Sequence, residues 1–317
     1  MRSRPTERQL GTLFALVAAV LFGTSGTVLA RSPDSATALG VGAVRLAIGG
    51  PLLLIVARFG GARMDRLAGL RATVIGGGLG VAAFQVLYFT ATTRTGVALG
   101  TVITIGSGPV FSGVIQSAIS RVTPTGAWVA GTAISIAGVT TLALSGDRSA
   151  VDAVGVLAAL GAGLGWASFA TLSKRQIEQG LDSTLSLGAM FTAAAVIVAP
   201  VMVLEPMGWL ATPRGLAVAI YLGAFTLTVA YALYGRALRV LPAPTVITLT
   251  LLEPVTASLL ASIVLHERIT PVGWVGIGAV LVGLVITARG ATVPIDDTHL
   301  GQHADGAATF ARQRARR

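Results

Sequence analysis

The sequence predicts an all-α integral membrane protein whose ten transmembrane helices form two inverted five-helix repeats. Composition, the spacing of apolar segments and an internal repeat lead to this prediction. Of the 317 residues, 53% are hydrophobic and only 11% are charged, and the mean hydropathy is +0.79. Because a soluble domain carries roughly 25% charged residues, this composition places the chain in the membrane class.

Ten apolar segments follow one another with short polar breaks, and each is close to the roughly 20 residues that a helix needs to cross a bilayer. Helices satisfy their own backbone groups in lipid, and the alternating pattern of a membrane barrel is absent. The first segment is too long for a signal peptide and has no convincing cleavage motif, so we expect a retained helix. The predicted spans are 9–30, 36–58, 70–92, 96–119, 125–145, 152–173, 183–204, 214–235, 242–265 and 270–288.

The distribution of Lys and Arg predicts that both termini are cytoplasmic. In that orientation 17 of the 23 basic residues lie in inner segments or span ends, 5 in outer loops or span ends and one, Arg45, in the middle of a span. Loops rich in Lys and Arg tend to lie on the cytoplasmic side of the cell membrane, so this bias predicts that the inner segments and both termini are cytoplasmic. The basic residues lie between apolar runs rather than on one face, so we expect membrane lipids as partners and no nucleic acid. The cytoplasmic tails are predicted at 1–8 and 289–317.

The second half of the chain repeats the first. RVTPTGAWVAG at 121–131 returns as RITPVGWVGIG at 268–278, an offset of 147 residues. Because each unit has an odd number of spans, the second must be inverted, as in many secondary transporters, whose sites lie near mid-membrane between the repeats. The predicted repeats are 9–145 and 152–288, joined by an outer linker at 146–151. Further matched pairs, at offsets of 144 to 146, are Phe22 with Trp166, Pro109 with Pro254, and Tyr88 with Tyr234.

Two charged residues, Glu253 and Arg45, lie in the middle of predicted spans, whereas the others fall in tails, loops or span ends. A charge at the bilayer centre costs at least about 2.5 kcal/mol on insertion scales, so each is expected to face the bundle interior or water. At 1.5 Å per residue, their depths differ by only about 4 Å. The sequence leaves two interpretations open. In the structural interpretation, the two residues form an ion pair, or Glu253 forms a hydrogen bond with backbone freed by Pro254. In the functional interpretation, one of them binds a zwitterionic or charged solute, or Glu253 carries a proton.

Aromatic and polar side chains suggest a substrate cavity around these charges. Gln85 and Tyr88 lie at i and i+3, on one helix face. A proline inside a helix removes a hydrogen bond and kinks it, so Pro109 and Pro254 are predicted hinges or static kinks. Small residues such as Gly276 and Gly283 are predicted to let helices pack closely. The predicted cavity residues are Phe22, Arg45, Gln85, Tyr88, Ser107, Phe111, Trp166, Tyr231, Tyr234 and Glu253.

The sequence lacks the residues that several classes of function require. The chain has no cysteine, so it offers no disulfide, thiolate or Cys-based zinc site. Its three histidines lie at a span end or in the tail, so no metal site is predicted, and no cofactor is expected. No GxxxxGK[ST] motif is present, and GTSG at 23–26 is not a GxSxG elbow. We therefore do not expect an enzyme. A membrane-embedded enzyme and a non-transporting sensor or structural protein remain the alternatives, and a homodimer stays open.

The stretch LLEPVTASLLASIVLHERITPVGWVGIGAVLVGLVI (251–286) resembles the second-repeat signature of the EamA-type permeases of the drug/metabolite transporter superfamily. GWASFATLSKR (165–175) is similar to the start of that repeat, and VRLAIGG (44–50) to its second-helix arginine pattern. The sequence departs from the family at His266, which replaces a glycine, and at Ser120, where the first repeat lacks a counterpart of Glu267.

The resemblance implies a bundle in which the first four helices of each repeat surround a central substrate cavity, with the fifth and tenth helices peripheral. It implies a secondary transporter of small-molecule substrates, such as amino acids or their derivatives. We expect an exporter that works by alternating access, with proton coupling left open.

Overall fold

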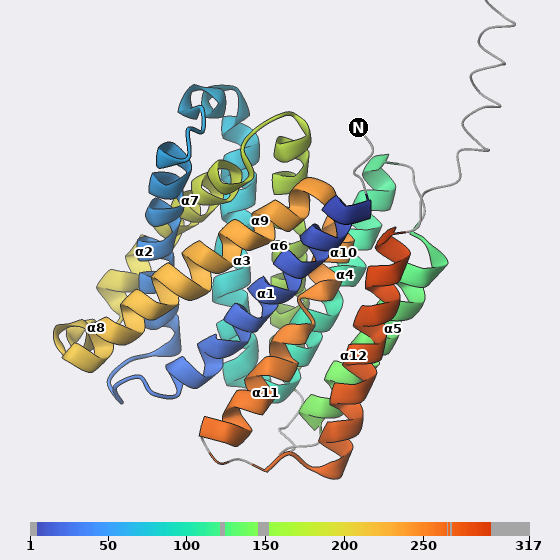
Figure 1. Cartoon of the computed structure of the whole chain (residues 1–317). Coiled ribbons are helices and arrows are strands. Elements are labelled where there is room, and N and C mark those ends of the chain that lie inside the picture. Colours follow the sequence, from blue (N-terminus) through green and yellow to red (C-terminus); the bar gives the residue numbers. More distant parts are fainter. Residues whose placement is uncertain (1–4, 121–123, 145–151, 265, 267, 293–317) are drawn as a thin grey trace, which may run out of the picture.

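The computed structural model describes residues 5–120, 124–144, 152–264, 266 and 268–292. The predicted linker, Glu267, most of the C-terminal tail and part of the N-terminal tail lie outside them. The described residues form one helical bundle without strands (Figure 1), and ten of its helical spans are long and apolar enough to cross a membrane. This confirms the predicted fold class.

The first repeat contains α1 (Pro5–Leu29), α2 (Ala38–Phe59), the short 3-10 segment η1 (Met64–Leu70), α3 (Arg71–Thr95), α4 (Val97–Ser120) and α5 (Gly126–Leu144). The second contains α6 (Ala153–Glu178), α7 (Ser183–Leu204), η2 (Gly208–Ala211), α8 (Pro213–Ile220), the π-helical segment η3 (Tyr221–Val229), α9 (Ala230–Val240), α10 (Ala243–Leu249), α11 (Leu252–Val264) and α12 (Pro271–Thr292).

The helix pairing has the symmetry of two inverted repeats. Helix α3 packs on α6 as α9 packs on α1, and α4 packs on α6 as α11 packs on α1. Helices α2 and α7 occupy equivalent positions in the two repeats and pack on each other, and so do α5 and α12. Exchanging the repeats therefore turns the α3–α6 and α4–α6 contacts into α9–α1 and α11–α1, and leaves the α2–α7 and α5–α12 contacts unchanged.

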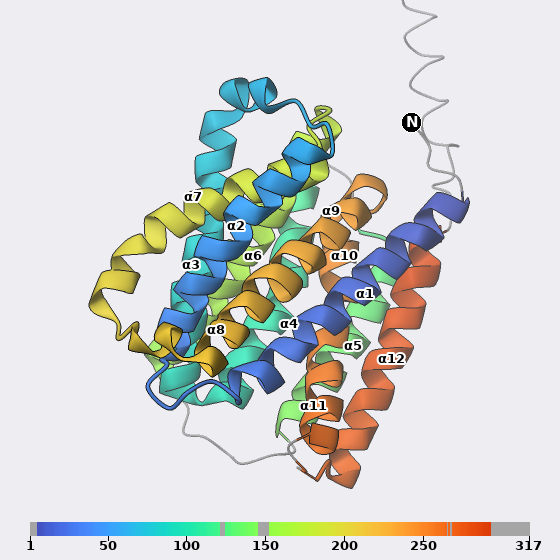
Figure 2. The same cartoon turned by 60° about the vertical axis from the view of Figure 1, so that its left-hand side comes forward.

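Helices α5 and α12 lie side by side at one edge of the bundle in both views (Figure 1, Figure 2). A Cβ atom added to Gly138 would lie 2.7 Å from the carbonyl oxygen of Gly276, and one added to Gly131 would lie 2.7 Å from that of Gly283. Only glycine lets the two backbones approach this closely. We call this contact, made by these four glycines, the glycine seam.

The predicted span 242–265 consists of two helices, α10 and α11, separated at Thr250 and Leu251. Pro254 has no N–H to donate to the carbonyl of Thr250, four residues before it, so an α-helical hydrogen bond is missing there. The backbone instead tightens: the N–H of Glu253 donates to Thr250 over 2.9 Å, and that of Leu251 to Thr248 over 3.0 Å. The break therefore ends one residue before the Glu-Pro pair. In the first repeat, by contrast, α4 runs without a break through Pro109.

The predicted span 214–235 is also irregular, because a π-helical segment, η3, lies between α8 and α9. In a π-helix the hydrogen bond reaches one residue further along the chain than in an α-helix, and such segments are frequent at functional sites. The hydroxyl of Thr228 donates to the carbonyl of Gly223, five residues before it, over 3.0 Å.

We predict that Gly276→Ala destabilises the protein by about 1 to 3 kcal/mol, because its methyl group would overlap the α5 backbone across the glycine seam. Gly278→Ala on the same helix is the matched control, because nothing lies within 4 Å of its added Cβ. That change should leave stability equal or raise it by up to about 1 kcal/mol through helix propensity. Heating the detergent-solubilised variants and measuring the remaining monodisperse fraction by size exclusion tests this. Equal midpoints for the two variants would contradict it.

Candidate functional site

We call the end of the bundle at which α1 begins the N-terminal end. A cavity of about 540 Å³ lies in the opposite half of the bundle. Leu29 and Ala38, on either side of the α1–α2 connection, line it, as do Ala257 and Ser258 of α11. The lining includes eight of the residues predicted from the sequence: Phe22, Arg45, Gln85, Tyr88, Trp166, Tyr231, Glu253 and Pro254.

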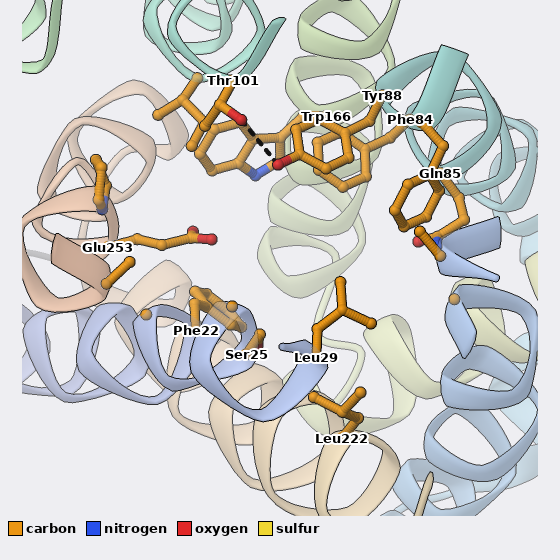
Figure 3. A pocket seen from close by; sticks show the side chains of 18 of the residues that line it. Phe22, Ser25, Leu29, Phe84, Gln85, Tyr88, Thr101, Trp166, Leu222 and Glu253 are labelled. Carbon is orange, nitrogen blue, oxygen red and sulfur yellow. Dashed lines mark hydrogen bonds between the residues drawn. The ribbon is translucent and has the colours of Figure 1, made fainter. Parts of the chain in front are cut away.

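Glu253 enters the cavity from the break between α10 and α11. It lies in the first turn of α11, where the partial positive charge of a helix N-terminus stabilises a carboxylate. Its side chain points into the cavity, whose opposite side is formed by Gln85 (Figure 3). Among the described residues, no side chain forms a hydrogen bond or an ion pair with this carboxylate.

Arg45 of α2 lines the same cavity and is held by the π-helical segment. Its Nη2 donates to the carbonyl oxygen of Thr226 over 3.0 Å, while its Nε is buried without a hydrogen-bond partner. Arg45 and Glu253 do not approach within the 4.0 Å of an ion pair. The two opposite charges therefore share one cavity without contacting each other, and the direct ion pair considered from the sequence is not observed.

One wall of the cavity is aromatic and comes from α3 and α6. The rings of Phe84 and Tyr88 stack with centroids 5.8 Å apart, and Trp166 lies 6.1 Å from Phe84. The Tyr88 hydroxyl forms a 2.9 Å hydrogen bond with Thr101 of α4 (Figure 3). Sequence reasoning missed Phe84, Phe89 and Thr101. Phe84 could have been found, because it lies four residues before Tyr88 and so on the same helix face.

Gly42 determines how the wall opposite Glu253 is built. A Cβ atom at this position would overlap the side-chain amide of Gln85 and would lie 2.8 Å from the ring of Phe89. A glycine on α2 therefore leaves room for Gln85, which is only 8% exposed, to reach the cavity from α3.

A second aromatic group closes the cavity toward the N-terminal end, and we call it the aromatic floor. The ring of Tyr231 lies at its centre, 4.8 Å from Phe22 and 4.3 Å from Phe191. Phe169 of α6 and Tyr234 of α9 complete it, with centroids 6.2 Å and 5.5 Å from that of Tyr231. The floor thus joins side chains of α1, α6, α7 and α9.

The remaining predicted residues, Ser107, Phe111, Tyr234 and the hinge candidate Pro109, are not in the cavity lining. Ser107 donates to the carbonyl of Thr104 over 3.2 Å and faces Gly163 of α6. Phe111 is half-buried on α4. Tyr234 is completely buried in the aromatic floor. For the described part of the chain, no cluster of three His, Asp or Glu side chains could hold a metal ion.

Known proteins resemble the chain along nearly its whole length. Residues 9–144 and 153–289 both match the model of the EamA-like transporter family. The Bacillus subtilis (strain 168) protein named Uncharacterized transporter YwfM is 36% identical over 275 residues, which cover 87% of this chain and 92% of that protein. The Threonine/homoserine exporter RhtA of Escherichia coli (strain K12) is 34% identical over 155 residues, which cover 47% of this chain and 50% of that protein.

A solved structure also shares the fold, with a TM-score of 0.76 over 89% of this chain and 99% of the other, at 18% identity. The family match covers both five-helix repeats, and the same two repeats enclose the cavity that holds Glu253 and Arg45. The chain therefore belongs to the EamA-like transporter family of the drug/metabolite transporter superfamily.

Proposed function

We propose that this transporter exports small zwitterionic metabolites, such as amino acids or their derivatives, across the cell membrane by alternating access. The observation that carries the proposal is the pair of opposite charges, Glu253 and Arg45, which line one cavity without contacting each other. A zwitterion supplies a charge for each. Its ammonium group suits the carboxylate of Glu253, and its carboxylate suits the planar guanidinium of Arg45.

The size and walls of the cavity support a small organic solute. A volume of about 540 Å³ lies within the usual range of roughly 300 to 1,000 Å³ for ligand pockets, which are mostly apolar with a few placed polar groups. The aromatic wall of Phe84, Tyr88 and Trp166 offers apolar surface for the body of the solute. Gln85 and the Tyr88 hydroxyl offer polar contacts beside it.

Charge compensation gives a physical reason for solute-dependent closure. Closing the cavity around two unpaired charges removes them from water, which is costly unless each gains a partner. A bound zwitterion provides both partners, so it favours the closed state over the open one by its differential affinity. Solute binding would therefore lower the barrier to exchange between the two sides.

The proposed direction of transport rests on the similarity to a protein named as an exporter. Glu253 is also the residue through which protons would couple to transport, because it is the one acid among the described residues that line the cavity. A membrane-embedded enzyme is less well supported, because the lining residues that the structure describes include no His, Lys, Asp or Cys to act as its nucleophile or base. No contact in the described residues favours the sensor alternative.

We predict that the two charges recognise opposite ends of the solute. In proteoliposomes loaded with a panel of radiolabelled amino acids, Glu253→Gln should weaken transport of the preferred solute about 10-fold or more, the effect of losing a contact to a charged group. The deaminated analogue, which has no ammonium group, should compete equally well in the wild type and in Glu253→Gln. Arg45→Gln should likewise weaken transport of the preferred solute, and the decarboxylated analogue, which has no carboxylate, should compete equally well in the wild type and in Arg45→Gln. Equal loss of competition by both analogues would show that the residues do not divide the recognition.

Proton coupling is tested by the same vesicles with a pH-sensitive dye inside. If Glu253 carries the proton, solute flux in the wild type moves protons, and flux in Glu253→Gln proceeds without them. The matched control is Glu178→Gln, which changes an exposed acid at the end of α6 outside the cavity lining and should keep coupled flux. Uncoupled flux of equal rate in wild type and Glu253→Gln would identify a facilitator.

A further inference from the structure

The cavity is closed at one end of the bundle by contacts between two groups of helices. The first group consists of α3, α4, α6 and α7, and the second consists of α9, α11, α1 and α2. Exchanging the two repeats interchanges these two groups. The cavity lies between them, and the aromatic floor closes it toward the N-terminal end. Phe169 and Phe191 of the first group meet Tyr231 of the second in this floor.

Beyond the floor, Lys174 connects the same two groups. This residue, the single lysine of the sequence, lies near the end of α6, and its Nζ donates to the carbonyl oxygen of Leu238 in α9 over 2.8 Å. Its side chain is only 16% exposed. The last carbonyls of a helix lack partners within the helix, and a cation there is favoured by the helix dipole. Lys174 therefore satisfies a free acceptor of the other helix group.

The inverted repeat shows what the equivalent contact at the opposite end would be. By the offset of Phe22 with Trp166, Lys174 corresponds to Ala30 at the end of α1. By the offset of Tyr88 with Tyr234, Leu238 corresponds to Thr92 of α3. Ala30 has no side-chain donor. The adjacent Arg31 donates to the carbonyl of Val264 in α11, a helix of its own group, over 3.4 Å.

We propose that Lys174 is a one-sided latch, which closes the N-terminal end of the transport cavity and so makes the opening at the opposite end the resting state. The inference rests on the proposed alternating access. To expose the cavity at the N-terminal end, the two helix groups must separate there and break the bond from Lys174 to Leu238. When the opposite end closes, no hydrogen bond equivalent to that from Lys174 to Leu238 forms. The state closed at the N-terminal end is therefore more stable than the state closed at the opposite end, although the two repeats have the same fold.

Thiol labelling tests the latch without any solute, because the chain has no cysteine of its own. Ala170→Cys reports the N-terminal end, since Ala170 is completely buried one turn before Lys174 on α6. Ala257→Cys reports the cavity, which it lines. Both are labelled with a water-soluble maleimide in detergent, so that both ends of the protein are accessible. Each reporter is measured alone and with Lys174→Met.

We expect Lys174→Met to speed labelling of Ala170→Cys and to slow that of Ala257→Cys, with a shift of about 10-fold in the equilibrium between the two states, as for loss of a hydrogen bond to a charged group. Lys174→Arg, which keeps a donor, should restore the wild-type rates. Glu178→Gln is the matched control: it removes the charge of the other partner of Lys174, 3.5 Å away and 61% exposed, and should change neither rate.

A purely structural role for Lys174 gives a different result, because general loosening would raise both labelling rates together. That result, or unchanged rates at both reporters, would overturn the latch. Ala30→Lys provides a second test that leaves Lys174 intact. A donor placed at the opposite end should slow labelling of Ala257→Cys, and an unchanged rate would also contradict the proposal. These outcomes do not depend on flux of any solute, so absence of transport would refute the proposed function separately.

Discussion

The structure depends on one constraint, which is that a chain in lipid must satisfy its backbone hydrogen bonds within itself. Two described spans depart from regular helix in their interior, at Thr250–Leu251 and at Tyr221–Val229, and both departures adjoin the cavity. At the first, the hydroxyl of Thr250 donates to the carbonyl of Ile247 over 2.7 Å. At the second, Arg45 donates to the carbonyl of Thr226. The irregular backbone thus occurs where side chains can compensate for it.

The same two departures position the charges of the cavity. Glu253 follows the break between α10 and α11, which places its carboxylate at the N-terminus of a half-helix in the middle of a predicted span. Arg45 is oriented by its bond to the π-helical segment. Because each charge is held by an element of its own, they stay apart rather than neutralising each other. The irregular segments and the unpaired charges are therefore one arrangement, which leaves room for a solute between them.

Much of this could be predicted from the sequence, and the failures have a common physical cause. The spans, the inverted repeat and the two interior charges follow from hydropathy, offset and the scarcity of charge. In a helix that is apolar on all sides, however, the hydrophobic pattern does not show which face is interior. Ser107 was therefore grouped with the cavity although it faces Gly163, while Phe84 was missed. Likewise, α4 continues through Pro109 whereas the chain breaks before Pro254, a difference that depends on packing around each proline.

The glycine seam has a consequence for assembly. A shift of 145 residues carries Gly131 to Gly276 and Gly138 to Gly283, so it exchanges the two contacts of the seam. This is the self-complementary geometry of a symmetric dimer interface, but here both sides belong to one chain. The peptide link gives each side a high effective concentration of the other. The seam is thus already occupied, and a second copy of the protein would have to associate through a different surface.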